Sequence, residues 1–227
     1  MTSVWKTLAA LALAGTMMTS SALDSAAPHQ DIDGTLFLVN REWRVSRYYQ
    51  PDVVLADVPG QVRNMREEAA RALEEMYAAA KEQDQITLTS ISGYRSYGKQ
   101  TTIYNRKLDR VGSKAKADEY VARPGASEHQ LGLAMDVGQR NKSGLTASFG
   151  STPGGKWIRE HCWEYGFILR YDEGWENVTG YKYEPWHVRY VGKETAQKLH
   201  ENTMPLEEYL QLARQDALMA ILLIDER

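Results

Sequence analysis

Apolar and polar positions follow two different periods along the chain, and each period predicts a type of secondary structure. The clearest helical period runs over residues 61–84, where charged side chains fill the face opposite the apolar one. The apolar face of this predicted helix is formed by Val62, Met65, Ala69, Ala72, Leu73, Met76 and Ala80. Further helices are predicted at residues 99–108, 153–164, 193–202 and 206–224.

Strands are predicted between these helices. Residues 86–91 alternate apolar and hydroxyl side chains, which is typical of a half-buried strand. Residues 126–137 hold too many glycines for a helix and predict a loop followed by a strand. Two more strands are predicted at residues 167–171 and 183–191. Strands that alternate irregularly with helices, without glycine-rich βαβ turns, predict a single α+β domain with a mostly antiparallel central sheet flanked by helices.

The first 22 residues have the pattern of an export signal. Lys6 gives a positive start, residues 8–18 are apolar, and residues 20–22 are small, as a signal peptidase requires. The apolar stretch is shorter than a comfortable membrane span. Residues 1–22 are therefore predicted to be a signal peptide, with an uncleaved N-terminal membrane anchor as the alternative.

The rest of the chain divides into three predicted segments. A polar linker covers residues 23–34, the folded domain covers residues 35–204, and a helical tail at residues 205–227 packs on the domain or follows it. The composition, 43% hydrophobic and 25% charged over 227 residues, is typical of a globular protein. The sequence carries no indication of the oligomeric state.

Charge and cysteine content narrow the function classes. The formal net charge is −3, and no basic run is present that would neutralise phosphates, so nucleic acid is excluded as an expected partner. Cys162 is the only cysteine, so the chain forms no internal disulfide. It falls on the apolar face of the helix predicted at residues 153–164, which indicates a buried thiol and not a nucleophile.

His129 and His187 are the two histidines with chemically suggestive neighbours. A catalytic zinc site needs three ligands of the His, Asp or Glu type and one open position for water. His129, Asp136 and His187 would supply two imidazoles and a carboxylate, although either histidine could instead be a hydrogen-bonded core residue. Glu184 is the natural general base, because a carboxylate beside the metal can take a proton from the attacking water. Pro185 disfavours a helix here, so Glu184 and His187 are predicted to converge from a strand or a tight turn.

Two motifs resemble a known family. Residues 127–136 read Ser-x-His-x-x-Gly-x-Ala-x-Asp, and residues 184–190 read Glu-Pro-Trp-His-x-Arg-Tyr. Both are similar to the VanY-type D-alanyl-D-alanine carboxypeptidases, peptidase family M15B, which have the hedgehog/DD-peptidase-like fold. The resemblance covers about residues 36–200 and extends to residues 38–41, 49–52, 92–96, 166–171 and 179–183.

The resemblance implies a role for each matching residue. It implies one zinc ion on His129, Asp136 and His187, with Glu184 as general base and Arg95 stabilising the substrate and the developing oxyanion. It also implies substrate contacts from Gln100 and Ser127. Candidate walls of the substrate groove are Tyr181, Tyr183 and Trp186, for each of which packing in the core is an equal alternative.

The implied activity is the removal of a terminal D-Ala from peptidoglycan stem peptides in the bacterial cell envelope, to which the chain would be exported. The alternatives are an L,D-carboxypeptidase, a peptidoglycan endopeptidase, and a non-enzymatic wall-binding module with a structural metal. Leu131 and residues 172–175 depart from the family pattern without touching a ligand. Among other charged residues, Arg170 and Arg189 are predicted to form structural ion pairs, and Glu128 to be a solvated charge on the rim.

Overall fold

The computed structural model of the chain describes residues 31–32, 34–139 and 145–225. The predicted signal peptide and most of the predicted linker lie outside these residues. The described chain forms two units. Residues Leu38–Leu206 make up the larger one, and the smaller comprises the described residues on either side of it. Within the described ranges, no helix is both long and apolar enough to cross a membrane.

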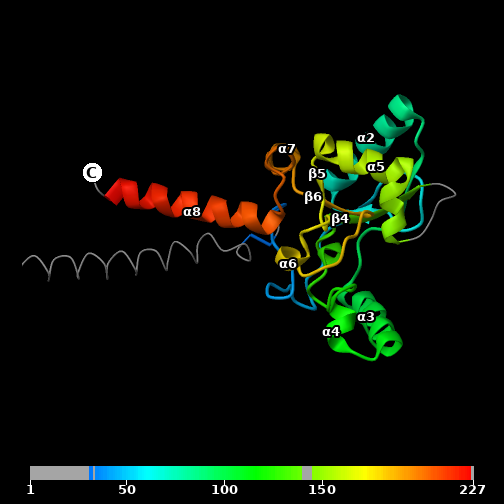
Figure 1. Cartoon of the computed structure of the whole chain (residues 1–227), viewed down its shortest axis with the longest axis horizontal. Coiled ribbons are helices and arrows are strands. Elements are labelled where there is room, and N and C mark those ends of the chain that lie inside the picture. Colours follow the sequence, from blue (N-terminus) through cyan, green and yellow to red (C-terminus); the bar gives the residue numbers. More distant parts are fainter. Residues whose placement is uncertain (1–30, 33, 140–144, 226–227) are drawn as a thin grey trace, which may run out of the picture. The chain divides into compact units, whose positions relative to one another are not determined.

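A four-stranded sheet is the centre of the larger unit (Figure 1). Its strands are β3 (Leu88–Ser92), β4 (Ala134–Gln139), β5 (Phe167–Leu169) and β6 (His187–Tyr190), in the order β3-β4-β6-β5. All neighbouring strands are antiparallel. A separate antiparallel pair joins β1 (Val54–Leu55) to β2 (Asn64–Met65). The α+β class with an antiparallel sheet is therefore confirmed.

Helices lie between and after these strands along the chain. They are α2 (Glu67–Asp84), α3 (Tyr97–Val111), α4 (Lys114–Asp118), α5 (Pro153–His161), α6 (Glu176–Thr179), α7 (Lys193–Asn202) and α8 (Leu206–Asp225). Helix α2 packs on β3, α5 packs on β4, and α3 packs on α4. Residues 61–84 are not one helix, because Asn64–Met65 pairs with Val54–Leu55 as a strand. The apolar face of α2 is nevertheless buried as its period predicts.

Helix ends are fixed by local side-chain chemistry. The Ser96 hydroxyl caps α3 by accepting from the Lys99 N–H, and the Thr152 hydroxyl caps α5 by accepting from the Gly155 N–H. Helix α5 ends at His161, and the chain continues as a short 3-10 turn, Cys162–Tyr165. Helix α5 is therefore shorter than the helix predicted at residues 153–164. Cys162 is buried, which confirms the prediction of a buried thiol, and burial raises the pKa of this thiol to about 12.

Gly132 shapes the chain between His129 and Asp136, two of the candidate metal ligands. A 3-10 turn, Glu128–Leu131, ends at Gly132, which has a φ of +71°. A Cβ at this position would lie 3.1 Å from Val53 Cγ1 and 3.2 Å from Arg66 Cγ. Glycine therefore satisfies both a left-handed backbone and a close approach. The sharp turn carries the chain from His129 directly into β4, which holds Asp136.

Candidate metal centre and active site

Three side chains from two segments of the sheet and one turn form a candidate metal centre. Asp136 on β4 and His187 on β6 are direct partners in the antiparallel register, and His129 comes from the 3-10 turn before β4. Nε2 of His129 and Nδ1 of His187 each lie 3.3 Å from Oδ1 of Asp136. One ligand atom from each residue lies within 4.8 Å of the others. The sheet register, and not sequence proximity, assembles this group.

The remaining nitrogen of each imidazole is engaged behind the centre. Nδ1 of His129 is 2.9 Å from the Gly93 carbonyl oxygen, and Nε2 of His187 is 3.3 Å from Oε2 of Glu128. These contacts leave Nε2 of His129 and Nδ1 of His187 facing Asp136. Such outer partners fix the ring orientation and tautomer of metal-binding histidines.

The group fits a divalent cation. Oδ1 of Asp136 is buried and has no hydrogen bond of good geometry, while two imidazole nitrogens point toward it. A cation bound by all three residues would satisfy this oxygen. Two imidazoles and one carboxylate are a ligand set that suits zinc, with a fourth position left for water or substrate. Among the described residues, the group has three members and lacks the fourth ligand typical of structural zinc sites.

Burial and neighbouring charges shift the pKa values of all three candidate ligands. Burial opposes ionisation of Asp136, but His129 and His187 together hold the pKa of its carboxyl well below its usual range. Burial and the nearby Arg95 lower the pKa of His129, which keeps its imidazole neutral. Burial also opposes the charge of His187, but Asp136 and Glu128 raise its pKa to about 9. The ionised Asp136 carboxylate supplies the negative charge for a cation, and a cation that binds His187 would displace the proton from its imidazole.

Glu184 lies in the tight turn that precedes β6. The His187 N–H donates to the Glu184 carbonyl at 3.1 Å, so the turn predicted from Pro185 is present. Oε2 of Glu184 is 3.9 Å from Nδ1 of His187, on the side that faces Asp136. Burial raises the pKa of the Glu184 carboxyl to about 8. The residue thus lies beside the candidate cation position without being one of its three ligands.

Arg95 lies on the other side of Asp136. Its Nη2 donates to Oδ2 of Asp136 at 3.3 Å and to the Ser92 hydroxyl at 2.9 Å, and its Nη1 donates to Oε1 of Gln100 at 2.9 Å. The Gln100 amide is itself held, because its Nε2 donates to the Ala122 carbonyl at 2.6 Å. Gln100 thereby fixes the guanidinium. A fixed guanidinium can bind a carboxylate or offset charge on a tetrahedral intermediate.

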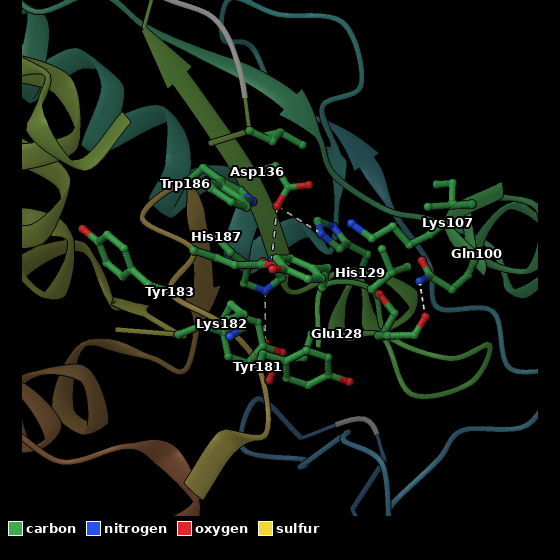
Figure 2. A pocket seen from close by; sticks show the side chains of 18 of the residues that line it. Gln100, Lys107, Glu128, His129, Asp136, Tyr181, Lys182, Tyr183, Trp186 and His187 are labelled. Atoms are coloured by element: carbon green, nitrogen blue, oxygen red, sulfur yellow. Dashed lines mark hydrogen bonds and ion pairs between the residues drawn. The ribbon is translucent and has the colours of Figure 1, made fainter. Parts of the chain in front are cut away.

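A pocket of about 680 Å³ joins these residues. Figure 2 shows Gln100 and Lys107 on one side of it, Tyr183 and Trp186 on the other, and His129, Asp136 and His187 between them. Ser127 and Tyr181 also line the pocket. Tyr181 is at the same time packed in the core, with its ring centroid 4.8 Å from that of Tyr171. Every site residue predicted from the sequence therefore borders one cavity.

The sequence is similar to that of a known protein family over more than half of its length. The family model described as VanY, D-alanyl-D-alanine carboxypeptidase, matches residues 62–193. The chain belongs to the VanY family. It is therefore a metallopeptidase, with the mixed helix-and-sheet fold that the resemblance implies.

Relatives of this VanY-family chain include enzymes and solved structures. The Bacillus subtilis protein YodJ is 43% identical over 197 residues, which are 83% of this chain and 71% of YodJ. The bifunctional D-Ala-D-Ala dipeptidase and carboxypeptidase VanXYC of Enterococcus gallinarum is 34% identical over 77% of this chain and 93% of its own. The LdcB LD-carboxypeptidase structure has a TM-score of 0.75 and 44% identity, covering 80% of this chain and 88% of LdcB. A VanY variant in complex with Zn(II) has a TM-score of 0.67 and 32% identity, covering 78% and 98%.

Glu128 is the residue of this VanY-family site that sequence reasoning missed. The prediction of a solvated rim charge is wrong, because Glu128 is 1% exposed. Its Oε1 accepts from Nε of Arg170 and from Nη1 of Arg189, both at 2.8 Å, while Oε2 faces His187. Burial opposes its charge, but the two guanidinium groups hold the pKa of its carboxyl well below its usual range. The predicted structural ion pairs of Arg170 and Arg189 are confirmed. Two arginines flanked by apolar strand residues were the available signal for a buried acid.

Proposed function

We propose that the chain is a zinc-dependent carboxypeptidase that removes a terminal D-Ala from peptidoglycan stem peptides. The observation that carries this proposal is the placement of Glu184 and Arg95 on either side of the His129, Asp136 and His187 group, in one pocket. Family membership supports it, as does a related structure of VanYB in complex with D-alanine-D-alanine. Export to the cell envelope, expected from residues 1–22, would bring the enzyme to this substrate.

In this mechanism His129, Asp136 and His187 would hold the zinc ion, which would supply a Lewis acid for the scissile carbonyl and lower the pKa of a water. Glu184 accepts a proton from the attacking water and passes it to the leaving amine. Arg95 offsets the negative charge that develops on the carbonyl oxygen or binds the terminal carboxylate. Gln100 keeps Arg95 in position through the bond at 2.9 Å.

The rest of the pocket would hold the peptide. The Ser127 hydroxyl can donate to or accept from the substrate backbone. Tyr183 and Trp186 provide half-buried rings along one wall, suited to contact with a small side chain. Tyr181, whose ring is packed against Tyr171, would contribute an edge of that wall.

Cleavage between an L residue and D-Ala is the second candidate. It is favoured by the similarity to LdcB, which at 44% identity exceeds the 32% identity to the zinc-bound VanY structure. The two reactions need the same ligands, base and guanidinium, since both release one C-terminal D-Ala. They differ in the residue that precedes the cleaved bond.

Metal removal tests the proposed chemistry. Protein treated with a chelator and then freed of it is expected to lose D-Ala release from a peptide ending in D-Ala-D-Ala, because the three ligands no longer hold a Lewis acid. Adding one equivalent of zinc is expected to restore it. Released D-Ala is measured by a coupled oxidase assay. Full activity of the metal-free protein would contradict the proposal.

A further inference from the structure

Three cations from one helix line the same pocket away from the metal centre. Arg106, Lys107 and Arg110 border the cavity together with Ile103, all on α3. Positions three, four and seven apart fall on one face of an α-helix, so these residues present one surface to the cavity. We call Arg106, Lys107 and Arg110 the basic wall. Figure 2 shows Lys107 beside Gln100, across the pocket from Tyr183.

Arg106 and Arg110 of the basic wall are exposed to solvent, and Lys107 is half-buried. In the part of the chain that the structure describes, Arg106 and Arg110 form no ion pair or hydrogen bond. Lys107 contacts the ring of Tyr120, with Nζ 4.0 Å from the centroid, and this contact leaves its ammonium donors available. Three cations that border one cavity without an acidic partner create a positive potential that attracts an anionic ligand.

Nearby acids are already engaged elsewhere. Asp118 accepts from Nε of Arg123 at 2.9 Å and from the Tyr104 hydroxyl at 2.8 Å. Glu119 pairs with Lys182 at 3.5 Å. Glu176 is the acidic residue of the lining outside the metal centre, and it comes from α6, not from α3. Asp109 is the acid of α3 itself, and among the described residues it forms no ion pair or hydrogen bond with Arg106 or Arg110. The acids of α3 and α4 therefore do not pair with the basic wall.

The direction of α3 sets the distance from the metal centre. The helix begins beside Arg95, to which Gln100 is bonded. At ~1.5 Å per residue, Lys107 and Arg110 lie about 10 and 15 Å further along the helix axis than Gln100. An extended peptide advances ~3.3–3.6 Å per residue, so this distance corresponds to about three or four residues.

We propose that the basic wall binds a carboxylate on the substrate, about three or four residues before the C-terminal end that is cleaved. The proposal rests on the proposed carboxypeptidase function and adds a preference for acidic peptides. Arginine side chains can hold a carboxylate with two hydrogen bonds, and Lys107 adds a third donor group. The basic wall would thus select the stem of the substrate, while the metal centre acts on its end.

Two matched peptides test this preference. Both end in D-Ala-D-Ala, and the residue three positions before the terminal D-Ala is glutamate in one and glutamine in the other. The zinc-loaded wild-type protein is expected to cleave the glutamate peptide with about tenfold higher kcat/KM, as one charge-assisted contact in a partly exposed site provides. A second pair carries the same change four positions before the end, because the distance along α3 corresponds to about three or four residues. In the triple variant Arg106→Gln, Lys107→Gln, Arg110→Gln, the ratio between the peptides is expected to fall to near one.

Lys99→Gln is the matched control. Lys99 lies on the same helix and carries the same charge, but it does not line the pocket, so the ratio is expected to persist. Equal kcat/KM for both members of both pairs in the wild type, or a ratio that survives in the triple variant, would overturn the proposal while the carboxypeptidase function stands. If neither peptide is cleaved, the proposed function fails, and calorimetric Kd values of the same peptides decide on the basic wall. Tighter binding of glutamate peptides, lost in the triple variant, supports it, and equal affinity refutes it.

Discussion

Replacing Glu184 with glutamine is expected to remove most turnover while zinc stays bound. Glutamine has nearly the same shape but cannot accept the proton of the attacking water. General-base catalysis by a positioned side chain contributes about 10²- to 10⁴-fold, so kcat should fall within that range. Glu184 is not one of the three ligands, and the nearest approach of its carboxylate to His187 is 3.9 Å. Zinc content should therefore remain near one equivalent.

Two measurements on the same preparation separate these effects. D-Ala release reports turnover, and elemental analysis after gel filtration reports zinc. Glu176→Gln serves as the matched control, because Glu176 lines the same pocket and belongs to none of the contacts around the metal centre. That variant should keep both zinc and most of its turnover. A Glu184→Gln protein that turns over like the wild type would show that the base is another group.

Replacing Glu128 with glutamine is expected to destabilise the fold and weaken zinc binding together. The change removes the negative charge that Arg170 and Arg189, which are 1% and 0% exposed, both contact at 2.8 Å. Removing one partner of a buried ion pair typically costs about 3–5 kcal/mol. The same change weakens the partner of Nε2 of His187, and loss of such an outer contact typically lowers metal affinity about 10- to 100-fold.

Urea unfolding of the metal-free protein measures the first effect, and competition with a chromophoric chelator measures the second. Glu194→Gln removes an acid of the same type from an exposed pair with Lys198 and should change neither quantity appreciably. If Glu128→Gln matches the wild type in both measurements, Glu128 neither neutralises the two arginines nor positions His187.

Local periodicity predicts most elements of the fold, because burial of one face follows from sequence spacing alone. It misplaces the start of α2, since Val62 and Met65 continue the apolar spacing while Met65 pairs with Val54 as a strand. The partner strand lies outside residues 61–84, so the spacing that predicts the helix does not reveal this pairing. Helix α5 is shorter than its apolar pattern for a related reason, as the chain tightens to a 3-10 turn at Cys162.

The residues of the candidate site are harder to connect from sequence spacing than the residues of a helix. Asp136 and His187 meet through the register of β4 and β6, which no spacing along the chain reveals, so motif resemblance was needed to connect them. Glu128 was misjudged because acids are mostly exposed, and its burial depends on arginines from β6 and from the residue after β5. The hydrogen bond from Arg95 to Gln100 likewise depends on side-chain geometry, which the spacing of residues along the chain does not reveal.

Mass spectrometry of muropeptides after digestion tests the central claim most directly, because it reports the bond and the product together. The zinc-loaded protein is expected to shorten stems ending in D-Ala-D-Ala by one alanine, with no change in the chelated protein. Loss of one alanine only from stems that end in a single D-Ala would assign the L,D reaction to the same site. No loss of terminal alanine from either stem, or cleavage at an internal bond, would contradict a carboxypeptidase built on His129, Asp136, His187 and Glu184.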